Sequence, residues 1–170
     1  MKSGAIFENF RVLIVEDNGH MRVLLRELLN ATGIREISEA PNGQAALRVL
    51  RDRRCDLILS DMAMAPMDGI EFTRHIRTDS NSPNPFVPII MVTGHTEKER
   101  VMAARDAGVT EFLAKPVTPK NLYGRIAEIV ERPRAFVRTE SYFGPDRRRK
   151  TLDTYGGPWR RHDDYDVGGQ

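Results

Sequence analysis

Short apolar runs alternate with segments of helical periodicity along most of the chain. Each run has the length of a strand and is rich in aliphatic residues, and a helical pattern follows it. This alternation is typical of parallel strands joined by helical crossovers, so the sequence predicts an α/β domain around one five-stranded parallel sheet. The predicted strands are 11–15, 36–40, 56–61, 86–94 and 111–115, and the predicted helices are 19–33, 43–54, 70–79, 97–108 and 119–132.

Cap residues mark the ends of two of these helices. Asn18 is a good N-cap for the first helix, because its short polar side chain accepts a free N–H group of the first turn. Gly33 and Gly108 stand where the first and fourth helical patterns stop, and glycine is the usual residue just past a helix. These signals support the helical interpretation of both segments.

The character of the chain changes after Pro133. The following residues include few aliphatic side chains, many turn residues and clustered charges. Such a segment cannot build a hydrophobic core of its own, so we expect it to be disordered when free. The sequence therefore predicts an N-terminal lead over residues 1–9, a folded domain over 10–133 and a C-terminal tail over 134–170.

Composition narrows the classes of function. The 26 Lys+Arg and 24 Asp+Glu residues give a net charge of +2, so the whole molecule has no strong bias toward nucleic acid or membrane. Cys55 is the single cysteine, which excludes an internal disulfide, and its place before an apolar run suggests a buried thiol. No apolar run approaches the roughly 18 residues of a membrane span, and no signal peptide is recognisable. We expect a soluble, cytoplasmic protein.

Polar side chains stand at the carboxyl ends of four predicted strands. Glu16 and Asp17 follow the first strand, whereas Asp61, Thr93 and Lys115 close the third, fourth and fifth. These ends meet at one edge of a parallel sheet, which is where ligands bind in such folds. Clustered carboxylates suit Mg²⁺, which also accepts phosphoryl oxygens. The sequence therefore predicts a phosphoryl-transfer site in which Asp61 is the nucleophile, Lys115 neutralises charge and Thr93 donates its hydroxyl.

Residues 10–131 resemble the receiver domain of response regulators, a CheY-like fold. The segments "VLIVEDN", "LILSDMAMAPMDGIEF", "PIIMVTG" and "FLAKP" carry the resemblance, in the order and spacing of the family. It implies a histidine kinase or phosphotransfer protein as the phosphoryl donor and a switch in place of turnover of a free substrate. It assigns Asp61 as phosphoacceptor, Glu16, Asp17 and Asp61 to Mg²⁺, and Thr93, Lys115 and Phe112 to switching, although Phe112 is equally well explained as a static core aromatic.

Some details near these motifs follow the family and others depart from it. The resemblance implies a cis peptide before Pro116. The family's usual Met-Pro after the acceptor is Met64-Ala65 here, and the proline is displaced to Pro66. Ala63 and His95 occupy two positions that tune the lifetime of the phosphoryl group in the family, so that lifetime is not predicted. An exposed histidine without a role is the simpler interpretation of His95.

The tail contains one motif twice: Tyr142-Phe-Gly-Pro-Asp-Arg-Arg and Tyr155-Gly-Gly-Pro-Trp-Arg-Arg. Gly-Pro favours a turn, paired arginines offer planar forks for phosphate or the O6/N7 edge of guanine, and aromatic rings offer faces for bases. Cyclic di-GMP has two guanines and two phosphates, which matches two copies of such a motif. The predicted ligand contacts are Tyr142, Asp146, Arg147, Arg148, Arg149, Tyr155, Trp159, Arg160 and Arg161.

A receiver followed by such a tail resembles the Cle proteins, CheY-like effectors of cyclic di-GMP. The segments "YFGPDRRRK" and "YGGPWRRHD" carry this resemblance. It implies that the tail binds cyclic di-GMP, as one molecule or a stacked pair, and that the protein acts at the flagellar motor switch. Two other interpretations remain open: a basic tail that binds RNA or DNA, and a chemotaxis-type regulator whose tail is a spectator.

Overall fold

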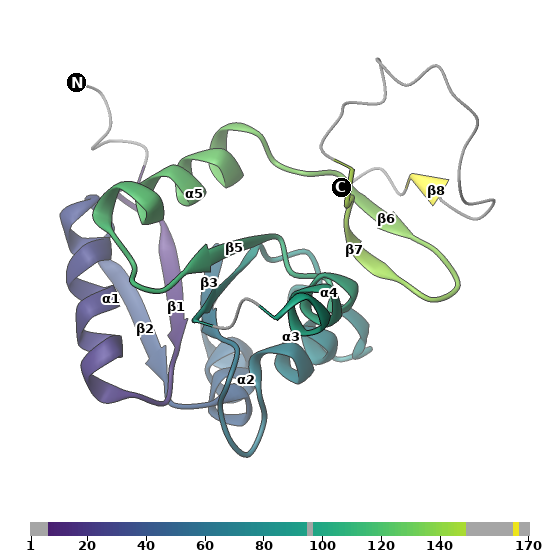
Figure 1. The fold of residues 1–170 in the computed structure, drawn as a ribbon, viewed down its shortest axis with the longest axis horizontal. Helices are drawn as coiled ribbons and strands as arrows, with labels where there is room; N and C mark the ends of the chain where they lie inside the picture. The colour runs from purple at the N-terminus through teal and green to yellow at the C-terminus, as the bar shows by residue number, and fades with distance from the viewer. Residues whose placement is uncertain (1–6, 95–96, 149–164, 167–170) are drawn as a thin grey trace.

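A parallel sheet of five strands, in the order β2-β1-β3-β4-β5, forms the centre of the molecule in the computed structural model (Figure 1). The structure describes residues 7–94 and 97–148, together with the backbone of 165–166. The predicted α/β fold is therefore confirmed. The strands are β1 (Arg11–Val15), β2 (Glu36–Ala40), β3 (Leu57–Asp61), β4 (Ile89–Thr93) and β5 (Glu111–Ala114). The helices are α1 (Gly19–Ala31), α2 (Gly43–Asp52), α3 (Gly69–Thr78), α4 (Lys98–Ala107) and α5 (Pro119–Glu131).

The helices cover both faces of the sheet, which explains the unbroken apolar runs of the inner strands. Helices α1 and α5 pack on one face, where Leu25 and Ile126 join a core cluster with side chains of β1, β3 and β4. Helices α2 and α3 cover the opposite face, where Ala46 and Phe72 pack against the other side of the same strands. Because helices cover both faces, only the ends of the strands leave polar side chains accessible, and a functional site is therefore expected there.

The residues predicted to cap the helices do so in the structure. The side chain of Asn18 accepts a hydrogen bond from the backbone N–H of Met21 at 3.0 Å and caps α1. Gly33 and Gly108 have positive φ angles of 99° and 107°, so both occupy the left-handed conformation that favours glycine. The peptide before Pro116 is cis, as predicted, and so is the peptide before Pro66.

The structure differs from the prediction for the first part of the tail. Strands β6 (Phe136–Arg138) and β7 (Phe143–Pro145) form an antiparallel hairpin, and β8 (Tyr165–Asp166) pairs with the other edge of β6. The expectation of disorder was therefore wrong for residues 134–148, which we call the C-terminal hairpin. Its buried side chains include Val137, Tyr142 and Phe143, and the ring of Phe143 packs against Phe86 of the receiver, so the hairpin does not depend on a core of its own.

Among the described helices, none combines the length and the apolar composition needed to cross a lipid bilayer.

Candidate functional site

Three carboxylates meet at the carboxyl edge of the sheet. Glu16 directly follows β1 and is buried, Asp17 is exposed beside it, and Asp61 is the buried last residue of β3. One oxygen from each of them lies within 4.8 Å of the others. The structure therefore brings together the three residues that the sequence assigned to Mg²⁺.

A lysine ammonium partly balances this negative charge. Nζ of Lys115, which follows β5, lies 3.2 Å from Oδ1 of Asp61 and 3.4 Å from Oε2 of Glu16. Burial raises the pKa of Glu16, and the charge of Asp61 raises it further. Burial alone would lower the pKa of Lys115, but the charges of Asp61 and Glu16 outweigh it, so this pKa is raised. The raised pKa of Lys115 thus reflects the two carboxylates beside it, whereas burial is the larger cause of the raised pKa of Glu16.

The donor set fits Mg²⁺. Three carboxylates face one ammonium group, which leaves excess negative charge for a divalent cation. The set contains only oxygen ligands, and exposed Asp17 keeps one side open to water, as Mg²⁺ requires. The backbone N–H of Asn18 donates to Oε1 of Glu16 at 3.1 Å and fixes that buried side chain. Glu16, Asp17 and Asp61 are therefore the residues that would hold the ion.

The loop after β3 positions the Asp61 side chain. The backbone N–H of Met62 donates to Oδ1 of Asp61 at 2.9 Å, and the N–H of Gly69 donates to the carbonyl of Met62, also at 2.9 Å. A Cβ on Gly69 would collide with the backbone carbonyl of Asp61, so this position requires glycine. We did not predict this role from the sequence, where only the Asp-Gly turn before α3 hinted at it.

The two other switch candidates lie on β4 and β5. Thr93 ends β4 and is buried, and its backbone carbonyl accepts a hydrogen bond from the N–H of Lys115 at 3.0 Å. Phe112 is half-buried against a cluster that includes Met62 and Met91. Thr93 therefore lies beside the acidic site, whereas the switching role of Phe112 stays a prediction. His95 lies outside the described residues.

The first copy of the repeated tail motif is engaged within the protein. Tyr142 is buried, and its hydroxyl donates to the carbonyl of Pro145 at 2.8 Å. The Arg147 guanidinium lies 4.0 Å from the centre of the Tyr142 ring, and Nε of Arg148 donates to Oδ1 of Asp146 at 3.2 Å. The remaining predicted ligand contacts lie outside the described residues; they are Arg149, Tyr155, Trp159, Arg160 and Arg161.

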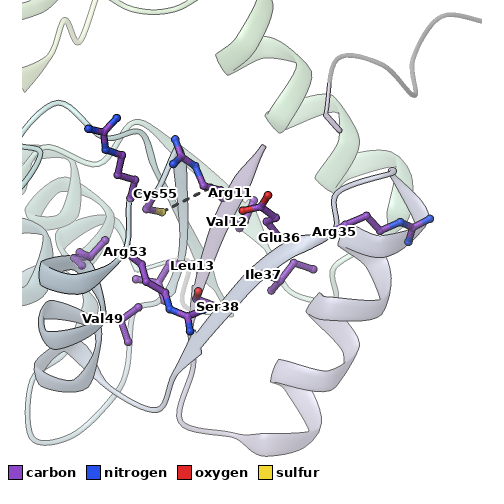
Figure 2. Close-up of a pocket in the computed structure, with 12 residues that line it drawn as sticks. Arg11, Val12, Leu13, Arg35, Glu36, Ile37, Ser38, Val49, Arg53 and Cys55 are labelled. Atoms are coloured by element: carbon purple, nitrogen blue, oxygen red, sulfur yellow. Dashed lines mark hydrogen bonds between the residues drawn. The ribbon is translucent and has the colours of Figure 1, made fainter. Parts of the chain in front are cut away.

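A basic hollow of about 390 Å³ lies at the opposite edge of the sheet, beside the amino ends of β1 and β2 (Figure 2). Arg11 lines it and forms an ion pair with Asp56 at 3.0 Å. Cys55 also lines it, half-buried, and its thiol donates to the carbonyl of Leu57 at 2.9 Å. Burial raises the pKa of Cys55 to about 11, so the thiol is neutral at physiological pH. The hollow shares no residue with the acidic site.

Comparisons of sequence agree with this geometry. Residues 12–127 match the family described as the response regulator receiver domain. The chain is 32% identical to the chemotaxis protein CheY-3 of Vibrio cholerae over 125 residues, which are 74% of this chain and 95% of that relative. It is 33% identical to the chemotaxis protein CheY of Pseudomonas aeruginosa over 122 residues, or 72% of this chain and 97% of that relative.

Solved structures agree as well. The chemotaxis protein CheY4 of Vibrio cholerae superposes with a TM-score of 0.65 at 32% identity, covering 71% of this chain and 98% of that one. The receiver domain of a sensor histidine kinase from Pseudomonas aeruginosa, solved with a magnesium ion in its active-site cleft, gives a TM-score of 0.65 at 29% identity over 72% of this chain and 98% of that one. With its five-stranded fold, its acidic cluster and these matches, the chain belongs to the response regulator receiver family.

Proposed function

We propose that this protein is a regulator with two inputs, whose receiver accepts a phosphoryl group on Asp61 and whose tail binds cyclic di-GMP. The observation that carries the first input is the cluster of Glu16, Asp17, Asp61 and Lys115 at one edge of the sheet. The acceptor is a side chain of the protein itself, so the phosphoryl group acts as a signal and no free substrate is turned over.

In the proposed transfer, an oxygen of Asp61 attacks the phosphorus of a phosphohistidine on a kinase or phosphotransfer protein. The P–N bond breaks, the electron pair stays on the histidine nitrogen, and an aspartyl phosphate forms. Mg²⁺ held by the three carboxylates would neutralise charge on the phosphoryl oxygens. Lys115 already contacts Asp61 at 3.2 Å, so its ammonium group is near enough to pair with the phosphoryl group. The hydroxyl of Thr93 is the second donor.

Labelling with a small phosphoryl donor tests this input. We expect acetyl phosphate and Mg²⁺ to add one phosphoryl group to the wild-type protein and none to Asp61→Asn, measured by intact-protein mass spectrometry. Asp52→Asn is the matched control, because Asp52 is an exposed aspartate at the end of α2, and it should be labelled like the wild type. Labelling of Asp61→Asn to the wild-type level would refute the assignment of the acceptor.

The proposal for the tail is supported by the repeated motif and by the exposure of Arg148. In the first copy, the Arg148 side chain remains 37% exposed beside the carboxylate of Asp146. An arginine fork next to a carboxylate can bind guanine, because the fork donates to O6 and N7 while the carboxylate accepts from the donor edge of the base. The second copy has Trp159 in place of Asp146, so it offers a ring for stacking beside its arginines. Together the two unequal copies fit one ligand with two guanines and two phosphates.

Calorimetry on the full chain tests the tail. We expect cyclic di-GMP to bind with micromolar or tighter affinity, and Arg148→Ala to weaken binding more than Lys150→Ala, since Arg148 loses a planar fork. Equal effects of the two substitutions would instead indicate diffuse electrostatic attraction. Absence of heat with cyclic di-GMP, together with salt-sensitive binding of generic RNA, would favour a nucleic-acid-binding tail.

The proposed output is a protein partner such as the flagellar motor switch. Support comes from the relatives, two of which are chemotaxis proteins by name. Binding to purified motor-switch protein should increase when the receiver is phosphorylated and cyclic di-GMP is present, as measured by biolayer interferometry. If deletion of residues 134–170 leaves this affinity unchanged under all conditions, the tail is a spectator and its proposed role is wrong.

A further inference from the structure

The C-terminal hairpin rests on the receiver beside α3 and α4 (Figure 1). It contacts Phe86, which precedes β4, and Gly108, which precedes β5. Three aromatic rings form the centre of this contact. Phe86 of the receiver lies 5.1 Å from the ring of Phe136 and 5.4 Å from the ring of Phe143, between ring centres. The two hairpin rings are 5.6 Å apart. Aromatic contacts of this kind stabilise an interface beyond the apolar area that they bury.

The backbones of the receiver and the hairpin also approach closely. Gly108, which ends α4, faces Gly144 of the repeated motif, and a Cβ on Gly144 would lie only 3.0 Å from the Cα of Gly108. A Cβ on Gly108 would in turn lie 3.2 Å from the carbonyl oxygen of Phe143. A Cβ on Gly144 would meet the Tyr142 side chain even earlier, at 2.5 Å from its hydroxyl, so this glycine serves the packing within the hairpin as well as its docking on the receiver.

A buried cation beneath the hairpin makes this docking less favourable than its apolar contacts alone. Arg77 is 3% exposed, and its guanidinium lies 5.0 Å from the centre of the Phe136 ring. It donates to the carbonyls of Gly108 and Val87, at 3.0 and 2.7 Å, but forms none of the ion pairs found among the described residues. Its Nη2 has no hydrogen-bond partner in that part of the chain. Burying a cation without a carboxylate opposes docking, so the docked state is one that a ligand can displace.

Arg147, one of the five arginines that were predicted to contact the ligand, holds the docked hairpin instead. One Nη of Arg147 donates to Oδ1 of Asp106 on α4 at 2.6 Å, and the same guanidinium covers the ring of Tyr142. Tyr142 as a whole residue is only 7% exposed. While the hairpin is docked in this way, the Tyr142 ring is covered and the Arg147 guanidinium is paired with Asp106. Neither group is therefore free to contact a base.

We propose that the receiver and cyclic di-GMP compete for Arg147, whose ion pair with Asp106 holds its guanidinium over the Tyr142 ring, so that the docked hairpin inhibits ligand binding by the first copy of the motif. This inference rests on the proposed binding of cyclic di-GMP by the tail. Coupling between two equilibria is reciprocal: whatever weakens docking strengthens ligand binding, and the ligand in turn releases the hairpin from the end of α4. The tail input thereby acts on the receiver through Asp106 and Gly108.

Phe86→Ala separates docking from direct contact with the ligand, because Phe86 belongs to the receiver and not to the tail. We expect cyclic di-GMP to bind the full-length variant on the order of tenfold more tightly, since two ring contacts that favour the competing state are lost. Asp106→Asn should tighten binding by about two- to fivefold, because an exposed ion pair contributes less. Both affinities are measured by calorimetry at one salt concentration.

Two matched control variants test whether the loss of any receiver ring, or of any acid in the hairpin, changes the affinity for cyclic di-GMP. Tyr123→Ala removes another partly exposed receiver ring, one that packs on Phe7, and Glu140→Gln removes an exposed acid of the hairpin. Both should bind like the wild type. Phe86 is itself 41% exposed, so its loss should leave the receiver folded, which thermal unfolding verifies.

The outcomes separate this inference from the proposed function. If the wild type binds cyclic di-GMP and both Phe86→Ala and Asp106→Asn bind with unchanged or weaker affinity, competition is refuted while the tail remains a ligand-binding segment. If neither the wild type nor any variant binds, the proposed function of the tail fails and the competition fails with it. Tighter binding by both variants but by neither control supports the inference.

Discussion

Lys115 and Arg77 are two positively charged side chains at opposite edges of the sheet, and their surroundings differ. Lys115 follows β5 at the carboxyl edge and contacts the carboxylates of Glu16 and Asp61. Arg77 lies near the amino edge, where it contacts backbone carbonyls and the ring of Phe136. The first cation belongs to a site with excess negative charge, and the second to a surface covered by the protein's own hairpin.

The difference indicates what each end can bind. Excess negative charge at the carboxyl edge attracts a divalent cation, and with it a phosphoryl group. The amino edge offers the Phe86 ring, which suits the aromatic side chains of residues 134–148, although Arg77, a cation without an ion pair among the described residues, opposes their docking. We therefore regard the carboxyl edge as the phosphoryl input and the amino edge as the place where the tail meets the receiver.

The largest effect on the free energy of unfolding is expected from removing Arg77, the cation at the amino edge. Arg77→Ala leaves several buried carbonyls without their donor and opens a cavity below Phe136, so it should lower the free energy of unfolding by about 3 kcal/mol. Urea unfolding measures this change. Arg74→Ala, an exposed substitution on the same helix, should be nearly neutral. Equal stability of the two variants would show that the covered surface contributes nothing to the fold.

Magnesium should act only at the carboxyl edge. At a Mg²⁺ concentration of about 100 times the dissociation constant, the free energy of unfolding should rise by about 2.7 kcal/mol, because the ion binds the folded state. Chemical unfolding at matched ionic strength measures this rise. Asp17→Asn should respond less, because one carboxylate of the set is lost. An equal rise with sodium chloride alone would mean that Mg²⁺ only screens charge.

A smaller effect is expected from the pH dependence of Glu16. Burial raises its pKa above the ordinary value of 4.5, so the folded state holds this proton more tightly than the unfolded state does. The contribution of Glu16 to stability is therefore full below pH 4.5 and falls as the pH rises through the raised pKa. Without Mg²⁺, Glu16→Gln should gain stability relative to the wild type across this window, measured by urea unfolding at several pH values. A constant difference would contradict the assigned cause.

The fold of the receiver could be predicted from the sequence because each strand and helix has its own local pattern of apolar residues. Strands buried on both faces appear as apolar runs, and each observed strand lies within its predicted range; β4 is the loosest case, since the prediction also included Phe86 and Pro88. The acidic site follows from the fold, because Glu16, Asp61 and Lys115 stand at strand ends that any parallel sheet brings to one edge.

The hairpin was not readable in this way. Its order depends on Phe86 and Gly108, which lie far from it in the sequence and present no pattern that links them to residues 134–148. Composition suggested disorder because it counts only the apolar residues within the segment. The steric role of Gly69 was missed for a related reason, since it depends on the backbone of Asp61 across a loop.

The most direct test of the account is a titration of the full-length protein with cyclic di-GMP, monitored by the backbone amide signals of the tail. We expect saturable shifts at Arg147 and Arg148, together with shifts at Gly108 and Asp106 as the hairpin leaves the end of α4. Unchanged tail amides at saturating ligand would contradict the central claim that the tail is a second input. Tail shifts with no change at Gly108 would preserve that input and exclude its competition with the receiver.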